Sequence, residues 1–96
     1  MRQVIWAETA LNDIDRNLSF ISAESKSAAI LVAERIDETV RMLAKRPIGR
    51  PGRMEGLYEK SVSKTSFIIA YKLSETDITI RRIIHSAQNW TEEEWP

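Results

Sequence analysis

The chain has 96 residues, 43% of them hydrophobic, which is enough for one compact core, so we expect a single domain over residues 1–96. Its 14 basic side chains balance its 14 acidic ones, which excludes a whole-molecule field that would attract nucleic acid or an anionic membrane. With no cysteine, one histidine, no apolar run of membrane-spanning length and no secretory signal, we expect a cytoplasmic protein that holds neither metal nor cofactor.

The chain is predicted to begin with a short strand and a helix. Residues 4–6, "VIW", are β-branched and aromatic, which favours a strand. Apolar residues then recur at spacings of three and four, which is typical of one face of a helix ending near Ser22. They are Ala7, Leu11, Ile14, Leu18 and Ile21. Asp13 lies outside this stripe, and we expect it to point into solvent with Asp15, Arg16 and Asn17.

A second helix follows, with Ser22 or Ser25 as its capping residue and a basic end at residues 44–46. Its inward stripe is expected at Ala28 or Ala29, Val32, Ile36, Val40 and Leu43. Because only a few residues join the two helices, they should form an antiparallel hairpin.

The second half of the chain is predicted to form three strands. Residues 46–56, "RPIGRPGRMEG", contain two of the three prolines and all three glycines, so neither a helix nor a strand ladder is expected there. Beyond them the apolar period becomes two over residues 57–62, 66–73 and 77–85. The order β-α-α-β-β-β predicts an α+β fold, in which the helical hairpin packs on one face of a mostly antiparallel sheet.

The stretch "IIHSAQNW", residues 83–90, ends the last strand and leaves two interpretations of His85 open. With Arg81 on the same strand face and Arg82 on the other, His85 could act as an acid or base on a phosphate-bearing substrate. Alternatively, it closes the strand by hydrogen bonding while the arginines face solvent or a partner. The chain has no nucleophile motif, phosphate-binding glycine loop or paired-carboxylate site.

Two further groups of residues are candidates for partner contacts. Arg46, Arg50 and Arg53 form the densest cluster of one charge and could bind acidic side chains or phosphates, with Glu59 nearby, or could be an ordinary solvated loop. The three tryptophans differ in their surroundings. We expect Trp6 in the core, Trp90 folded back onto the sheet, and Trp95 exposed or held by a partner.

The chain resembles the ParE branch of the ParE/RelE toxin superfamily from Val4 to Trp90. The resemblance rests on the short first strand, the helical hairpin, "RPIGRPGRMEGLYE", "FIIAYKL" and "ITIRRIIHSAQNW". Its most specific positions are Gly52, Arg53, Gly56, Glu59, Tyr71 and the ending His85, Gln88 and Trp90.

The resemblance implies a RelE/ParE-like fold and the toxin of a type II toxin-antitoxin pair. Such a toxin is neutralised by a ParD-like antitoxin of the ribbon-helix-helix type, in a hetero-oligomer that meets operator DNA only through the antitoxin. ParE-like toxins are thought to bind DNA gyrase and trap its cleavage complex, so the resemblance implies a binding protein and no enzyme. Arg46, Arg50, Arg53, Glu59, Arg81, Arg82 and Trp95 are then the candidate antitoxin- or target-binding residues, and His85, Gln88 and Trp90 a structural strand end.

Two other functions stay open. The superfamily's RelE-like and YoeB-like branch cuts messenger RNA on the ribosome, using an arginine in the penultimate strand and a histidine or tyrosine near the end of the chain. Here the corresponding stretch of the penultimate strand holds Phe67, Ile68 and Ile69, so that catalytic set looks absent. The third possibility is a module with weak toxicity that still pairs with its antitoxin.

Overall fold

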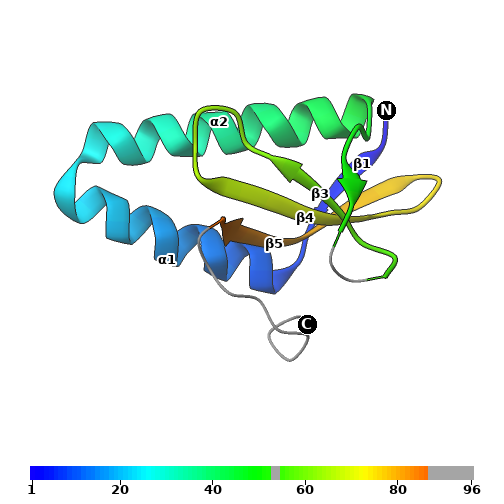
Figure 1. Cartoon of the computed structure of the whole chain (residues 1–96), viewed down its shortest axis with the longest axis horizontal. Coiled ribbons are helices and arrows are strands. Elements are labelled where there is room, and N and C mark those ends of the chain that lie inside the picture. Colours follow the sequence, from blue (N-terminus) through cyan, green and yellow to red (C-terminus); the bar gives the residue numbers. More distant parts are fainter. Residues whose placement is uncertain (53–54, 87–96) are drawn as a thin grey trace.

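The computed structural model describes residues 1–52 and 55–86, and these form one sheet with two helices (Figure 1). In chain order the elements are β1 (Gln3–Trp6), α1 (Glu8–Glu24), α2 (Lys26–Lys45), β2 (Arg50–Pro51), β3 (Tyr58–Ser61), β4 (Phe67–Leu73) and β5 (Asp77–His85). The α+β fold is therefore confirmed. Among the described residues, neither helix has the length and apolar character needed to cross a membrane.

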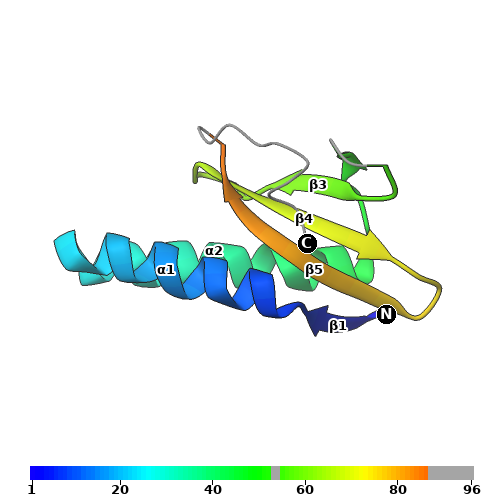
Figure 2. The same cartoon turned by 90° about the horizontal axis from the view of Figure 1, so that it is seen from below.

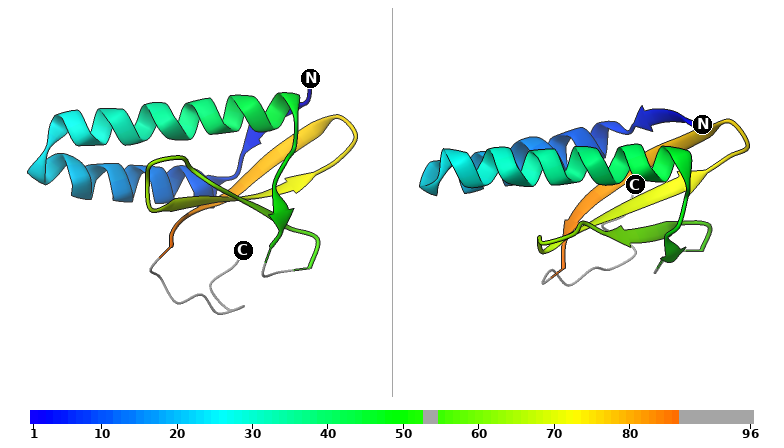
Figure 3. Two further views of the ribbon diagram at one scale, coloured as in Figure 1. Left: turned by 45° about the horizontal axis from the view of Figure 1, so that its top comes forward. Right: turned by 90° about the horizontal axis from the view of Figure 1, so that it is seen from above.

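The two helices form the predicted antiparallel hairpin, and its closed end extends past the sheet (Figures 1 and 3). Ser25 alone separates α1 from α2. Its Oγ accepts a hydrogen bond of 3.1 Å from the backbone N–H of Ala28, which caps one of the unsatisfied donors at the start of α2.

The sheet has the strand order β1-β5-β4-β3-β2. Among the described strands, β1 and β5 pair in parallel and the other pairs are antiparallel, so the sheet is mostly antiparallel, as predicted. The expectation that no ladder enters residues 46–56 is wrong, because Arg50 and Pro51 pair with Glu59 and Tyr58 of β3. The proline is tolerated because β2 is an edge strand, where its missing N–H removes no ladder bond.

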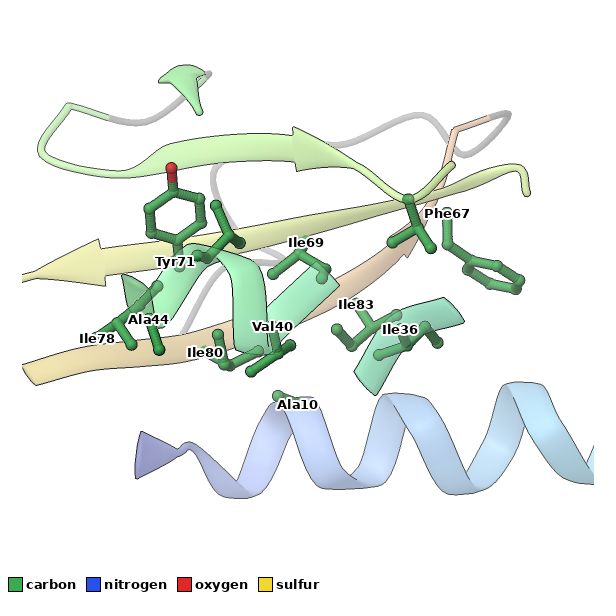
Figure 4. Close-up of a cluster of buried hydrophobic side chains, with 12 residues drawn as sticks. Ala10, Ile36, Val40, Ala44, Phe67, Ile69, Tyr71, Ile78, Ile80 and Ile83 are labelled. Atoms are coloured by element: carbon green, nitrogen blue, oxygen red, sulfur yellow. The ribbon is translucent and has the colours of Figure 1, made fainter. Parts of the chain in front are cut away.

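The helical hairpin packs on one face of the sheet and encloses the core there (Figure 2). Ile36 and Val40 of α2 lie in one buried cluster with Ile69 and Tyr71 of β4 (Figure 4). Leu43 belongs to the same cluster, as the spacing of the α2 stripe predicts. Trp6, expected in the core, is partly buried against the same cluster. Ile68, Ala70 and Ile84 form a second buried cluster, which confirms that β4 is apolar on both faces.

A β-bulge interrupts the ladder between β4 and β5. Tyr71 pairs with Ile80, whereas its neighbour Ala70 pairs with Arg82, so Arg81 is one extra residue on β5. The bulge shifts the alternation of the strand by one position. Ile83 therefore joins Ile80 in the core, while Arg82 falls on the side opposite to that predicted by a regular strand.

Candidate functional site

The end of β5 is attached to α1 by hydrogen bonds from two helix side chains. Beyond Ile80, β5 is no longer paired with β1, and α1 lies beside it instead. Thr9 Oγ1 donates to the carbonyl oxygen of Arg81 at 2.7 Å, and the N–H of Ile83 donates to Oδ2 of Asp13 at 3.0 Å. We call these contacts, together with the Asp13–Arg82 pair, the β5 clamp.

Asp13 is the centre of the clamp, and its predicted solvent-facing position is wrong. The residue is only 2% exposed, although it lies beside the apolar stripe of α1. Arg82 donates from Nε to Oδ2 at 2.7 Å and from Nη2 to Oδ1 at 3.1 Å, which is the bidentate geometry of a strong pair. Arg16 adds a bond of 2.8 Å to Oδ1. The carboxylate is thus compensated on both oxygens, as a buried charge must be.

His85 lines a hollow between the hairpin and the end of the sheet. This His85 hollow has a volume of about 410 Å³ and is bounded by Asn17, Phe20, Ile21, Val32, Thr65, Ser66, Phe67 and His85. The imidazole packs edge-on against Phe67, with ring centroids 5.4 Å apart and planes at 87°. Phe20 stands at 76% exposure beside the hollow. The walls are mostly apolar with polar groups among them, which is typical of a binding pocket.

Basic side chains gather where α2 ends and the sheet edge begins. A hollow of about 380 Å³ at the end of α2 is lined by Arg41, Lys45 and Arg46 together with Glu38 and Met42. Arg50 follows on β2, where its Nη2 lies 3.9 Å from Oε1 of Glu59. We call Arg41, Lys45, Arg46 and Arg50 the basic corner; all four residues are exposed.

Gly49, the residue before Arg50, belongs to a tightly packed layer around Tyr71. The Tyr71 ring is fully buried and stacks on Tyr58 with a centroid distance of 5.7 Å. Gly49 lies directly against the Tyr71 hydroxyl, for which the described residues provide no hydrogen bond of acceptable geometry. Burial raises the pKa of Tyr71 above its usual 10.0, and the nearby backbone amide of Gly49 only partly offsets that rise.

The outer side of the hairpin carries a second apolar surface. A groove of about 810 Å³ runs between α1 and α2, and small side chains such as Ser22, Ala29 and Ala33 form part of its lining. Leu11 and Ile30 border this groove at 51% and 60% exposure. Such an open apolar groove on a helix pair is typical of a site that receives another helix.

The structure brings some of the predicted site residues together and separates others. Arg50 lies near Glu59 on the neighbouring strand, and Arg46 lines a separate hollow at the end of α2, whereas Arg82 is held by Asp13 with a side chain only 13% exposed. Glu59 is 3% exposed, so it is buried on β3, where it pairs with Arg50 of β2, instead of lying on the surface. Arg81 is the bulged residue of β5. The remaining predicted residues, Arg53, Gln88, Trp90 and Trp95, lie outside the described residues.

Sequence reasoning missed Asp13, Gly49 and Thr9. The sequence gives no local signal for Asp13, since Thr9, Arg16 and Asn17 are its neighbours on the same side of the helix. Within the described part of the chain, no group of three or more histidine, aspartate or glutamate side chains could hold a metal ion.

A family model, described as the ParE toxin of the type II toxin-antitoxin system parDE, matches residues 4–90. The chain belongs to the ParE toxin family. A relative from Sinorhizobium fredii that is named as a toxin, Y4kP, is 32% identical over 90 residues, covering 93% of each chain.

The fold of this ParE toxin is also found in solved structures. The chromosomal ParDE system of P. aeruginosa contains a chain that is 21% identical, with a TM-score of 0.79 over 88% of this chain and 96% of that one. The E. coli DinJ–YafQ complex is more distant, at 15% identity and a TM-score of 0.59 over 90% of this chain and 93% of that one. Both similarities concern the fold.

Proposed function

We propose that this ParE toxin acts by binding, as an inhibitor of DNA gyrase, and that a ParD-like antitoxin neutralises it. The observation that carries the proposal is the composition of the His85 hollow. Within its described lining, His85 is the sole titratable side chain. Acid-base cleavage of RNA usually needs at least two such groups, or one with a cationic partner, around the reacting phosphate. Arg82 could have been that cation, but its guanidinium is already paired with Asp13.

Two surfaces support the antitoxin as a partner. An amphipathic helix could lay its apolar side in the groove between α1 and α2, where Leu11 and Ile30 are exposed. Acidic side chains that follow it could meet the basic corner, with Arg53 as a further predicted contact. The ParDE system and the DinJ–YafQ complex share this fold, which agrees with a toxin that is stored in complex with its antitoxin.

The gyrase target is tested with purified toxin and purified gyrase. Gyrase should lose its supercoiling activity and accumulate cleaved DNA as toxin is added, and stoichiometric antitoxin should restore activity. The toxin is used folded, in excess and freshly released from its antitoxin. If supercoiling and DNA cleavage then stay unchanged, gyrase is excluded as the target.

A ribosome-dependent ribonuclease is the second candidate, because His85 faces an open hollow at the end of β5. Primer extension on transcripts after toxin induction would then reveal cuts in phase with codons. Their absence in a growth-arrested culture would remove this candidate, and cuts that vanish in His85→Ala would favour it over the gyrase proposal.

A further inference from the structure

The end of β5 is a strand edge that a helix covers. β1 pairs with β5 only from Asp77 to Ile80, so none of the described strands reaches the backbone groups of later residues on that side. Buried backbone groups nearly always need a hydrogen-bond partner. Thr9 and Asp13 of α1 supply it, through the carbonyl of Arg81 and the N–H of Ile83. Side chains of α1 therefore fix the end of β5 where a strand would otherwise do so.

Asp13 is suited to this task by its four hydrogen bonds. Oδ1 accepts from Arg16 and Arg82, and Oδ2 accepts from Arg82 and from the N–H of Ile83. Every one of these partners is a donor. An asparagine at this position would place its own N–H₂ against a donor, so the contact needs both carboxylate oxygens.

The clamp lies directly beside the His85 hollow and connects its two walls. Asn17, Phe20 and Ile21 of α1 follow Asp13 by one to two helical turns and form one wall. Phe67 and His85 form part of the other wall, and His85 comes two residues after Ile83. A change in the Asp13 contacts would therefore alter the width of the hollow and the position of the end of β5.

We propose that Asp13 is a positioning residue for the toxic surface of this protein. It touches no target itself, but by holding Arg82 and Ile83 against α1 it sets the geometry of the His85 hollow and of the strand end beside it. The inference rests on the proposed function, since it assumes that toxicity depends on a shaped binding surface. It also separates that surface from the basic corner. The His85 hollow is lined by Val32 in the first half of α2, whereas the basic corner begins at Arg41 near the end of the helix.

The test compares Asp13→Asn with Asp37→Asn, a matched change on an exposed pair in which Asp37 lies 2.8 Å from Arg41. We expect Asp13→Asn to reduce growth inhibition at least tenfold while the antitoxin dissociation constant changes less than threefold. Hydrogen exchange should accelerate at least tenfold at the Ile83 amide. The Ala7 amide, which donates to Ile80 where β1 still pairs with β5, should keep its rate. Asp37→Asn should leave growth inhibition and both exchange rates unchanged.

A second variant covers the case in which Asp13→Asn does not fold. Thr9→Val removes the neighbouring bond to Arg81 without leaving a buried charge, and we expect it to lower toxicity at least threefold with an intact melting transition. Full toxicity of a folded Asp13→Asn, or of Thr9→Val, would overturn the proposal. So would an equal loss of toxicity and antitoxin affinity in both variants. If wild-type toxin leaves gyrase untouched, the proposed function fails, while the exchange rate at Ile83 still tests the clamp.

Discussion

Gly49 is so close to Tyr71 that a larger residue there must displace buried atoms. A Cβ at this position would lie 2.7 Å from the carbonyl oxygen of Glu59 and 2.9 Å from Cζ of Tyr71, and closer still to the Tyr71 hydroxyl. The first atom belongs to the backbone of β3, and the second belongs to a ring with 0% exposure. Neither can move aside without disturbing the sheet.

The expected cost follows from overpacking. Forcing a methyl group into a well-packed interior costs about 1 to 3 kcal/mol, and we place Gly49→Ala near 3 kcal/mol because two of the three close contacts are rigid. For a domain of this size, that loss lowers the melting temperature by roughly 12 to 24 °C. Urea unfolding followed by circular dichroism measures the change directly.

A double-mutant cycle with Tyr71→Phe identifies the contact responsible. Removing the Tyr71 hydroxyl takes away the atom closest to the Cβ that Gly49→Ala introduces. It also removes a buried polar group that has no hydrogen bond of acceptable geometry among the described residues. Tyr71→Phe alone should therefore raise the free energy of unfolding by about 1 kcal/mol, and the two changes should couple by at least about 1 kcal/mol.

Gly56→Ala is the control, because it adds backbone strain without a steric contact. Gly56 has φ +84°, and a Cβ added there would have no described atom within 4 Å, so we expect a loss of about 1 kcal/mol that does not couple to Tyr71. Equal urea midpoints for Gly49→Ala and the wild type, or additive effects in the cycle, would refute the packing described for Gly49 and Tyr71.

Four further outcomes are expected. Because burial raises the pKa of Tyr71 above 10.0, the folded state keeps a proton that the unfolded state releases. The contribution of Tyr71 to the free energy of unfolding should thus be constant below about pH 9 and fall as the pH rises above 10. The wild type should therefore lose stability more steeply in this range than Tyr71→Phe, and equal slopes would contradict burial as the cause. Asp13→Ala removes the carboxylate that binds the largely buried side chain of Arg82 and should cost about 3 to 5 kcal/mol in urea unfolding, and a loss below about 1 kcal/mol would argue against a desolvated pair. Arg46→Glu should weaken antitoxin binding by more than the roughly 1 kcal/mol of an exposed pair, measured by calorimetry, and an unchanged dissociation constant would remove Arg46 from the interface. His85→Ala should keep gyrase inhibition within about tenfold if the imidazole only lines the hollow, whereas complete loss would indicate a direct role.

Hydropathy patterns predicted the elements of this fold because each element buries one side. The stripe through Ile36, Val40 and Leu43 and the alternation through Ile69 and Tyr71 both meet in the same core. The parallel pairing of β1 with β5 was not predictable in the same way, since it depends on where the hairpin returns the chain. The two-residue β2 was missed because it is too short to have a period and contains a proline.

The candidate site was less predictable because its geometry depends on contacts between distant residues. The basic corner could be anticipated from the arginines alone, since they lie close together in the sequence. The β5 clamp joins residues about 70 positions apart, and nothing local to Asp13 distinguishes it from its exposed neighbour Asp15. A buried acid is recognised only once its donors are placed around it.

The bulge at Arg81 interrupts the regular alternation of buried and exposed side chains along β5. A regular alternation would place Ile78, Ile80 and Arg82 on one face of β5, so that the charged side chain of Arg82 would either lie in the core or face a partner. The core isoleucines of β5 are instead Ile78, Ile80 and Ile83, spaced by two and then three. That break in spacing is the sequence signature of one inserted residue, and it moves Arg82 to where Asp13 can bind it. The same insertion therefore places Arg82 in the clamp that fixes the end of β5 against α1, so a single irregularity of the strand determines how its last residues are held.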